Sequence, residues 1–194
     1  MKLLITEKPS VAMEFAKVLN VPQNKKNGYI EANGWIITWC YGHLVTMSYP
    51  EVYDENLKFW RLDTLPFIPT DWKYEIISGG IQEKQFQIIK NLMQREDIEE
   101  IYNAGDSGRE GEYIQRLVLM MANPNPKAKL KRVWIDSQTE DEIRRGIKEA
   151  KDSSEYDSLS DTAYLRAKED YLIRNKFFKI IIYYFWQKNC KRFE

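Results

Sequence analysis

Three short apolar segments recur along the first 150 residues, and each is followed by a polar turn and a segment with helical periodicity. They cover residues 2–6, 100–104 and 132–135. Short apolar runs bounded by polar residues are typical of strands that are buried on both faces. Strands that alternate with helices at this spacing favour βαβ units. The pattern therefore predicts an α/β fold with a central, mostly parallel sheet flanked by helices.

The segments between and after these strands carry apolar residues at helical spacing. They predict helices over residues 9–19, 82–95, 112–121, 139–150 and 156–173. Pro9 suits the first turn of the first helix, where its missing N–H costs nothing. Thr139, with Glu142 three residues later, predicts a capping box at the start of the fourth.

The region between the first helix and residue 80 has a different character. Asn33-Gly34 separates residues 29–31 from residues 35–39, which predicts a β-hairpin with a tight turn. Residues 41–80 are rich in proline and aromatic residues, and they predict loops with short elements.

Charge and composition exclude several classes of protein. Lysine and arginine number 29 and so do the acids, so the net charge is zero and an overall basic, DNA-coating surface is excluded. A local basic patch remains possible within this balance. Cys40 and Cys190 are far apart and predict no disulfide framework. His43 is the only histidine in the sequence, which excludes a metal centre built on several histidines.

Neither end of the sequence predicts membrane insertion. The apolar start meets Glu7, Lys8 and Pro9 at once, unlike a secretory signal peptide. The longest apolar run, residues 177–186, is interrupted by Lys179 and has about half of the roughly 20 residues that a membrane helix needs. We therefore expect a reduced, cytoplasmic protein with no membrane partner.

The polar turn at residues 105–112 is the sharpest chemical signal in the sequence. It joins a predicted strand to a predicted helix, and Glu7 occupies the same kind of junction after the first strand. The carboxyl ends of parallel strands meet at one edge of a sheet, where ligands bind. We therefore expect Glu7, Asp106 and Glu110 to converge. Carboxylate oxygens are the ligands that Mg²⁺ prefers.

Two cations accompany these acids. Arg109 offers a planar fork for a phosphate, and Lys8 offers a second positive charge. A structural interpretation stays open beside the functional one, because acids in such turns often cap helices and arginines often form surface ion pairs. Equally, His43 could be structural, and the basic run at residues 127–132 could be a solvated face.

Several motifs in a fixed order make the sequence resemble a known family. They are Glu7-Lys8-Pro9-Ser10, Tyr41-Gly42-His43-Leu44, residues 103–112 and residues 133–139. Together they resemble the N-terminal part of the type IA DNA topoisomerases, most similar to the bacterial topoisomerase III branch. The resemblance implies a Toprim domain over residues 1–150, followed by a short helical extension. Residues 151–173 would begin the helical DNA-binding domain, and residues 174–194 would be a divergent tail foreign to the family.

The resemblance also implies roles for individual residues. It implies catalytic roles for Glu7, Lys8 and Arg109, with Glu7 as a general acid or base at the scissile phosphate. It implies that Mg²⁺ is the cofactor and that its ligands are Glu7, Asp106 and Glu110. It implies contacts with single-stranded DNA from Lys8, His43, Arg109, Ser137, Gln138, Thr139 and Arg166.

Two departures from the family pattern bear on activity. Gly108 stands where the pattern has its second aspartate, so we expect weaker metal binding, for which Glu112 could substitute. None of the twelve tyrosines lies in a motif like that of the family's nucleophile, so we expect this chain not to cut DNA alone. The loss of similarity after residue 173 favours a frameshift or a decayed gene copy.

Two alternatives to a topoisomerase part stay open. One is a metal-dependent Toprim nuclease or primase-like enzyme, which acts without a tyrosine. The other is a non-enzymatic DNA-binding remnant.

Overall fold

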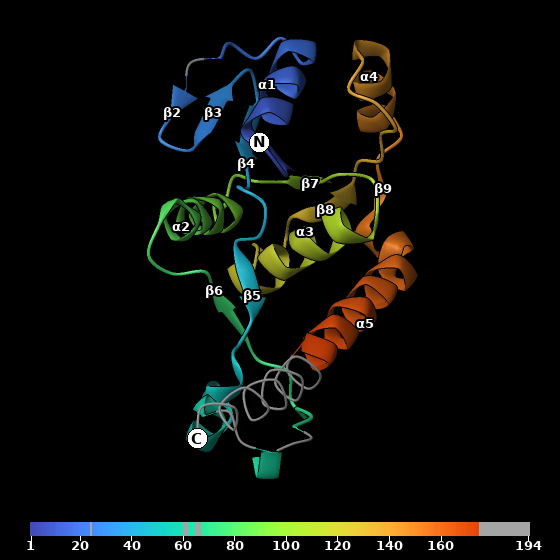
Figure 1. Ribbon diagram of the computed structural model, residues 1–194. Helices are drawn as coiled ribbons and strands as arrows, with labels where there is room; N and C mark the ends of the chain where they lie inside the picture. The colour runs from blue at the N-terminus through green and yellow to red at the C-terminus, as the bar shows by residue number, and fades with distance from the viewer. Residues whose placement is uncertain (24, 60–61, 65–66, 175–194) are drawn as a thin grey trace, which may run out of the picture. The chain divides into compact units, whose positions relative to one another are not determined.

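The computed structural model describes residues 1–23, 25–59, 62–64 and 67–174. These residues form two compact units (Figure 1). The first combines Met1–Thr46 with Ile76–Ala163, and the second combines Met47–Glu75 with the described residues from Tyr164 onward. The predicted tail lies outside the described residues except for Arg174. None of the described helices is both long enough and apolar enough to span a lipid bilayer.

The first unit is built on a seven-stranded sheet with the strand order β2-β3-β4-β1-β7-β8-β9. In that order the strands are Lys25–Lys26, Tyr29–Ala32, Trp35–Trp39, Lys2–Thr6, Glu100–Ala104, Lys129–Arg132 and Lys151–Asp152. The four central strands β4, β1, β7 and β8 are parallel. Antiparallel pairs complete the two edges. The predicted α/β class with a mostly parallel central sheet is therefore confirmed.

The register of the central strands aligns their carboxyl ends. Thr6, the last residue of β1, pairs with Trp39 of β4 on one side and with Ala104 of β7 on the other. The residues that directly follow β1 and β7 therefore emerge at the same edge of the sheet.

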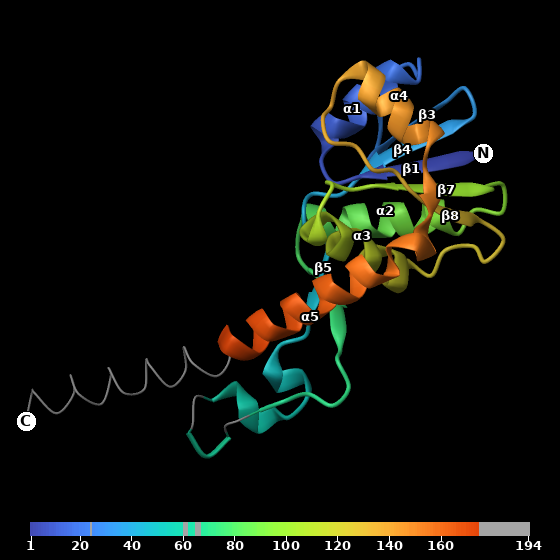
Figure 2. The same cartoon turned by 90° about the vertical axis from the view of Figure 1, so that its right-hand side faces the viewer.

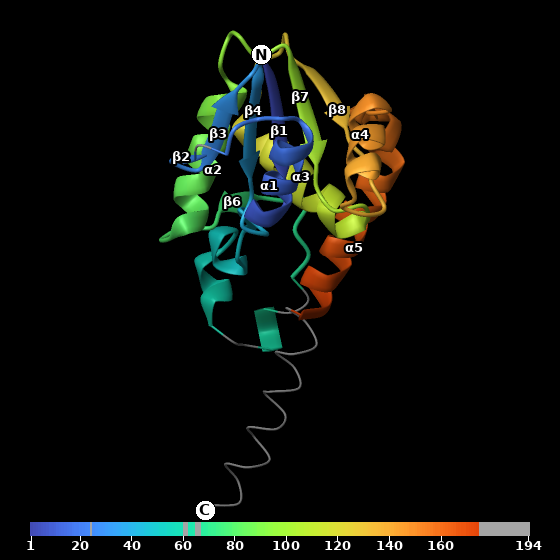
Figure 3. The same ribbon diagram turned by 90° about the horizontal axis from the view of Figure 1, so that it is seen from above.

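Helices cover both faces of this sheet. Helices α1 (Pro9–Val18) and α4 (Glu140–Lys148) lie on one face, and α2 (Ile81–Met93) and α3 (Arg109–Ala122) lie on the other (Figures 2 and 3). The buried core against α1 and α4 includes Phe15, Ile37, Val133 and Ile143. Helix α5 (Asp157–Ile173) begins in the first unit after a short 3₁₀ turn, Ser153–Tyr156.

The second unit contains mainly short elements, as the proline-rich sequence predicts. A separate two-stranded sheet, β5 (Val45–Met47) with β6 (Tyr74–Ile76), carries the chain out of the first unit and back. Three 3₁₀ turns lie between these strands, at Pro50–Val52, Glu55–Lys58 and Leu62–Thr64. Tyr171 of α5 packs its ring edgewise on Trp72 and donates its hydroxyl hydrogen to the Ser48 carbonyl at 2.9 Å.

The predicted hairpin is confirmed, since β3 and β4 pair around Asn33 and Gly34. Both turn residues have positive φ, 52° and 80°, which is the conformation that Asn-Gly favours.

The third parallel strand was placed wrongly. We predicted it over the apolar residues 132–135, but β8 spans Lys129–Arg132. Two of its charged side chains are paired with acids: Lys131 contacts Glu100 of the neighbouring strand β7 at 2.6 Å, and Arg132 is fully buried against Glu112 of α3. Ion pairing has thus replaced the apolar pattern that usually marks a strand.

The capping box was also wrong. Thr139 is the N-cap of α4, but its side chain makes no capping hydrogen bond. The Glu142 carboxylate instead accepts a hydrogen bond from the backbone N–H of Asp136 at 3.0 Å. The glutamate therefore fixes the segment that enters the helix three residues before the N-cap.

Candidate active site

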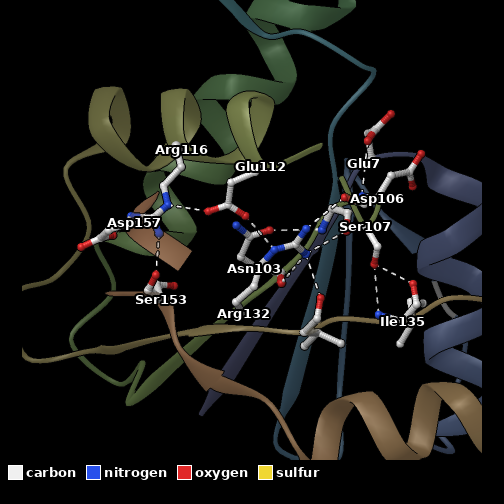
Figure 4. Close-up of polar contacts among 12 residues, drawn as sticks. Glu7, Asn103, Asp106, Ser107, Glu112, Arg116, Arg132, Ile135, Ser153 and Asp157 are labelled. Atoms are coloured by element: carbon white, nitrogen blue, oxygen red, sulfur yellow. Dashed lines mark hydrogen bonds and ion pairs between the residues drawn. The ribbon is translucent and has the colours of Figure 1, made fainter. Parts of the chain in front are cut away.

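Glu7 and Asp106 meet at the carboxyl edge of the sheet, directly after β1 and near the end of β7 (Figure 4). Glu7 is only 8% exposed, and its carboxylate accepts a hydrogen bond from the Asp106 N–H at 3.4 Å. The Lys8 ammonium lies 3.4 Å from Glu7 Oε1 and 3.1 Å from Asp106 Oδ2. These neighbours raise the pKa of Lys8, the hydrogen bond to Asp106 most of all. Of the three acids expected to converge, Glu7 and Asp106 therefore lie together, with Lys8 between them.

Two glycines allow the turn after β7 to pack tightly. A Cβ on Gly111 would lie 2.2 Å from the Asp106 carbonyl oxygen and 2.8 Å from the Asp106 nitrogen. A Cβ on Gly105 would lie 2.7 Å from Cγ of Gln115 and 3.0 Å from the Gly111 carbonyl oxygen. The first turn of α3 therefore rests directly on the backbone of Asp106, and no larger residue fits there without a shift.

Arg132 holds the same turn from inside the sheet, and the sequence pattern did not reveal this. Its guanidinium is fully buried and donates to the carbonyls of Gly105 at 2.8 Å and Asp106 at 2.9 Å. It also donates to the carbonyl of Val133 and to a Glu112 oxygen, both at 2.8 Å. Burial lowers the pKa of Arg132, while Glu112 opposes that shift. The sequence offered one signal for this role, an arginine as the first residue of the strand predicted over residues 132–135.

Ser107 links the turn to the segment that follows β8. Its hydroxyl donates to the Ile135 carbonyl at 2.6 Å and accepts from the Ile135 N–H at 3.1 Å. The chain that follows β8 is thereby fixed beside Asp106 (Figure 4).

Glu112 does not act as the substitute ligand that the sequence suggested. Its side chain is 1% exposed, and each carboxylate oxygen is paired with an arginine, Arg132 on one side and Arg116 on the other. A carboxylate already occupied in this way has no free oxygen to offer a metal.

Glu110 takes a different position from the two converging carboxylates. Its side chain is 82% exposed and lies 3.8 Å from Nε2 of His43, while the His43 ring packs edgewise near Tyr113. Across residues 1–174 as far as they are described, no three His, Cys, Asp or Glu side chains gather closely enough to hold a metal. The geometry thus joins Glu7 with Asp106 and pairs Glu110 with His43.

The Glu7–Asp106 pair nonetheless fits a hard cation. Two carboxylates already share one ammonium group between them, and oxygen donors of this kind suit Mg²⁺, which keeps several waters in its coordination shell.

The remaining predicted DNA-contacting residues are divided between the two units, with Arg109 and residues 137–139 in the first unit and Arg166 in the second. Arg109 at the start of α3 is exposed, and so are Ser137, Gln138 and Thr139 in the segment before α4. Arg166 belongs to the second unit, where it pairs with Glu169 at 3.2 Å and Asp170 at 3.4 Å.

Known proteins similar to this chain point to one family. Residues 2–137 match the Toprim domain family. The chain is 44% identical to DNA topoisomerase 3 of Staphylococcus aureus (strain MRSA252) over 172 residues and 42% identical to that of Shouchella clausii (strain KSM-K16). These matches cover 88% and 89% of this chain but 23% of either relative.

A solved structure of full-length topoisomerase I from Thermotoga maritima has a TM-score of 0.49 to this chain and 20% identity. It covers 77% of this chain, which covers 21% of that one. The match over residues 2–137 is broad enough to assign the family: this chain belongs to the Toprim domain family and is similar in sequence to part of bacterial DNA topoisomerase 3.

Proposed function

We propose that this chain is the Toprim part of a DNA topoisomerase III-like enzyme, which breaks and rejoins single-stranded DNA in the cytoplasm. The observation that carries the proposal is the meeting of Glu7, Lys8 and Asp106 at the carboxyl edge of the sheet. Its relatives are named as DNA topoisomerase 3, and the chain matches 23% of their length, so the reaction of the whole enzyme is inferred here from that part.

In this function the side chains of the site take separate roles. Glu7 lies directly after β1 at the carboxyl edge of the sheet, and we assign it the role of general acid or base at an oxygen of the scissile phosphate. Lys8 and Arg109 would hold phosphate oxygens as cations at the mouth of the site. Asp106 and Glu7 would hold Mg²⁺, with Glu110 joining when its side chain turns away from His43.

A bound divalent ion stabilises the charge that develops on the phosphate during phosphoryl transfer. As the described side chains lie, Glu7 and Asp106 offer adjacent carboxylates to one ion, and water and phosphate oxygens would fill the coordination sites that protein carboxylates leave open. Further contacts with DNA, away from the reacting atoms, would come from His43, Ser137, Gln138, Thr139 and Arg166. We place the tyrosine nucleophile outside this chain, and we expect the chain to bind DNA without cutting it.

A cation titration of the purified protein tests the first step of this proposal. We expect saturable Mg²⁺ or Mn²⁺ binding in calorimetry, and we expect Asp106→Ala to abolish it. Asp97→Ala is the matched control, because Asp97 precedes β7 at the opposite edge of the sheet and pairs with Arg95 at 2.7 Å. Equal binding in all three proteins would contradict the proposed site.

The same protein should then be incubated with labelled single-stranded DNA and Mg²⁺. We expect a retarded complex and no cleavage product. Metal-dependent strand cleavage without a covalent protein–DNA adduct would instead identify a nuclease that acts through metal and water.

A further inference from the structure

A chain of ion pairs, buried at its inner end and exposed at Asp157, leads from the Asp106 turn to the start of α5 (Figure 4). Arg132 contacts Glu112 at 2.8 Å, and the other oxygen of Glu112 contacts Arg116 at 2.7 Å. Arg116 in turn contacts the carboxylate of Asp157, the first residue of α5, at 2.9 Å. All of these residues belong to the first unit.

The inner end of this chain fixes the backbone of Asp106. Its carbonyl accepts from Arg132 at 2.9 Å, and its N–H donates to Glu7 at 3.4 Å. The direction of the Asp106 carboxylate therefore depends on where the Arg132 guanidinium lies. A fully buried guanidinium needs a counter-ion, and Glu112 is the carboxylate that meets it.

The outer end determines where Glu112 lies. Its carboxylate is divided between two arginines, so its orientation is set by both of them. Arg116 has its own three acceptors: Glu112, the Asp157 carboxylate and the Ser153 carbonyl. A planar guanidinium can satisfy three acceptors in fixed directions, which a lysine ammonium cannot reproduce.

We propose that Glu112 and Arg116 are positioning residues for the Glu7–Asp106 pair, and that the start of α5 is their outer anchor. The proposal rests on the proposed cation-binding function of that pair. It gives different roles to two acids of the turn at residues 105–112. Asp106 would bind the cation directly, while Glu112, six residues later, would affect cation binding through its ion pair with Arg132. A displacement at Asp157 reaches the Asp106 turn through three successive ion pairs.

The first test measures Mn²⁺ affinity by calorimetry in wild type, Arg116→Gln and Asp157→Asn. We expect Arg116→Gln to weaken binding about tenfold, the usual effect of losing a group that orients a metal ligand. Asp157→Asn should weaken it in the same direction. The control is Arg144→Gln, which removes an exposed arginine paired with Glu140 at 2.8 Å on α4 and should leave affinity unchanged.

The second test needs no metal. Amide hydrogen exchange should become faster at Asp106 and at Ile135 in Arg116→Gln, while the amides of β1 keep their protection. A uniform increase throughout the first unit would mean general destabilisation, which overturns a positioning role. If Arg116→Gln fails to fold, the same exchange measurement on Asp157→Asn tests the positioning role. Asp157 is 61% exposed, so removing its charge leaves the buried ion pairs intact.

The two proposals fail in different ways. If wild type binds no cation, the metal part of the proposed function is wrong, and hydrogen exchange alone decides the positioning role. If wild type binds and the folded Arg116→Gln and Asp157→Asn proteins bind equally well, the positioning role is wrong and the proposed function stands.

Discussion

At the scale of single residues, Gly111 controls where the backbone of Asp106 can lie. We expect Gly111→Ala to cost about 3 kcal/mol of the free energy of unfolding and to abolish cation binding, because its Cβ would approach the Asp106 carbonyl oxygen to 2.2 Å. Urea denaturation and cation titration measure the two effects. Gly80→Ala is the control: the only neighbour of its Cβ within 4 Å is the end of the Gln82 side chain, and we expect a cost below about 1 kcal/mol.

Gly108 offers the opposite experiment, because a Cβ at this position meets nothing within 4 Å. Gly108→Asp places a carboxylate between Asp106 and Glu110 in sequence, as the family pattern has it. We expect tighter Mn²⁺ binding in a calorimetric titration. We also expect a loss of about 1 kcal/mol in stability, since the φ of +159° at this position is rarely adopted by other residues. Unchanged affinity would show that a carboxylate at this position does not reach the cation.

The sequence could predict Glu7 and Asp106 because strand topology alone brings them together. Residues that follow neighbouring parallel strands must emerge at one edge, whatever the side chains between them do. It could not predict the role of Arg132, because a charged residue in a strand usually faces water. The ion pair of Arg132 with Glu112 and its contacts with carbonyl groups exist only once the crossover between β7 and β8 has formed.

At the scale of secondary-structure elements, elements set by neighbouring residues were predictable, and the strand whose position depends on a long-range ion pair was not. The Asn33-Gly34 hairpin and the bounds of β1 and β7 follow from residues adjacent in sequence. The position of β8 does not, because Lys131 is held by Glu100 of β7, some thirty residues earlier in the sequence. Strands stabilised by cross-strand ion pairs lack the apolar periodicity that single-sequence prediction relies on.

That ion pair makes stability depend on pH. The hydrogen bond from Lys131, together with one from Tyr102, lowers the pKa of Glu100 from 4.5 to about 2. Because the pKa is lower in the folded state, the stabilisation is present above pH 4.5 and is lost as pH falls toward 2. We expect Glu100→Gln to cost about 1 kcal/mol at pH 7 in chemical denaturation. The difference from wild type should shrink between pH 4.5 and pH 2.

Glu155→Gln provides the control for this pH effect. Glu155 is 54% exposed and pairs with Lys151 at 3.3 Å, so its replacement should alter stability little at any pH. A Glu100→Gln protein whose deficit stays constant from pH 7 to pH 2 would contradict the assignment of the effect to ionisation.

At the scale of the whole molecule, a net charge of zero limits how DNA can be bound. Attraction must come from local cations, and the exposed candidates are Lys8, which contacts Asp106, and Arg109, three residues after Asp106 in sequence. Two phosphate contacts on single-stranded DNA predict a slope of about −1.4 in a plot of log affinity against log salt concentration. Affinity should therefore fall about sevenfold between 50 and 200 mM salt.

Single substitutions test whether those two cations are the contacts. We expect Arg109→Ala to reduce the magnitude of the slope by about 0.7, since one phosphate contact is lost. Lys127→Ala should leave the slope unchanged, because Lys127 precedes β8 at the opposite edge of the sheet from the carboxylate pair. Fluorescence anisotropy with a labelled oligonucleotide measures both. A slope that responds to Lys127 but not to Arg109 would place the DNA on the other edge of the sheet and separate DNA binding from the Glu7–Asp106 site.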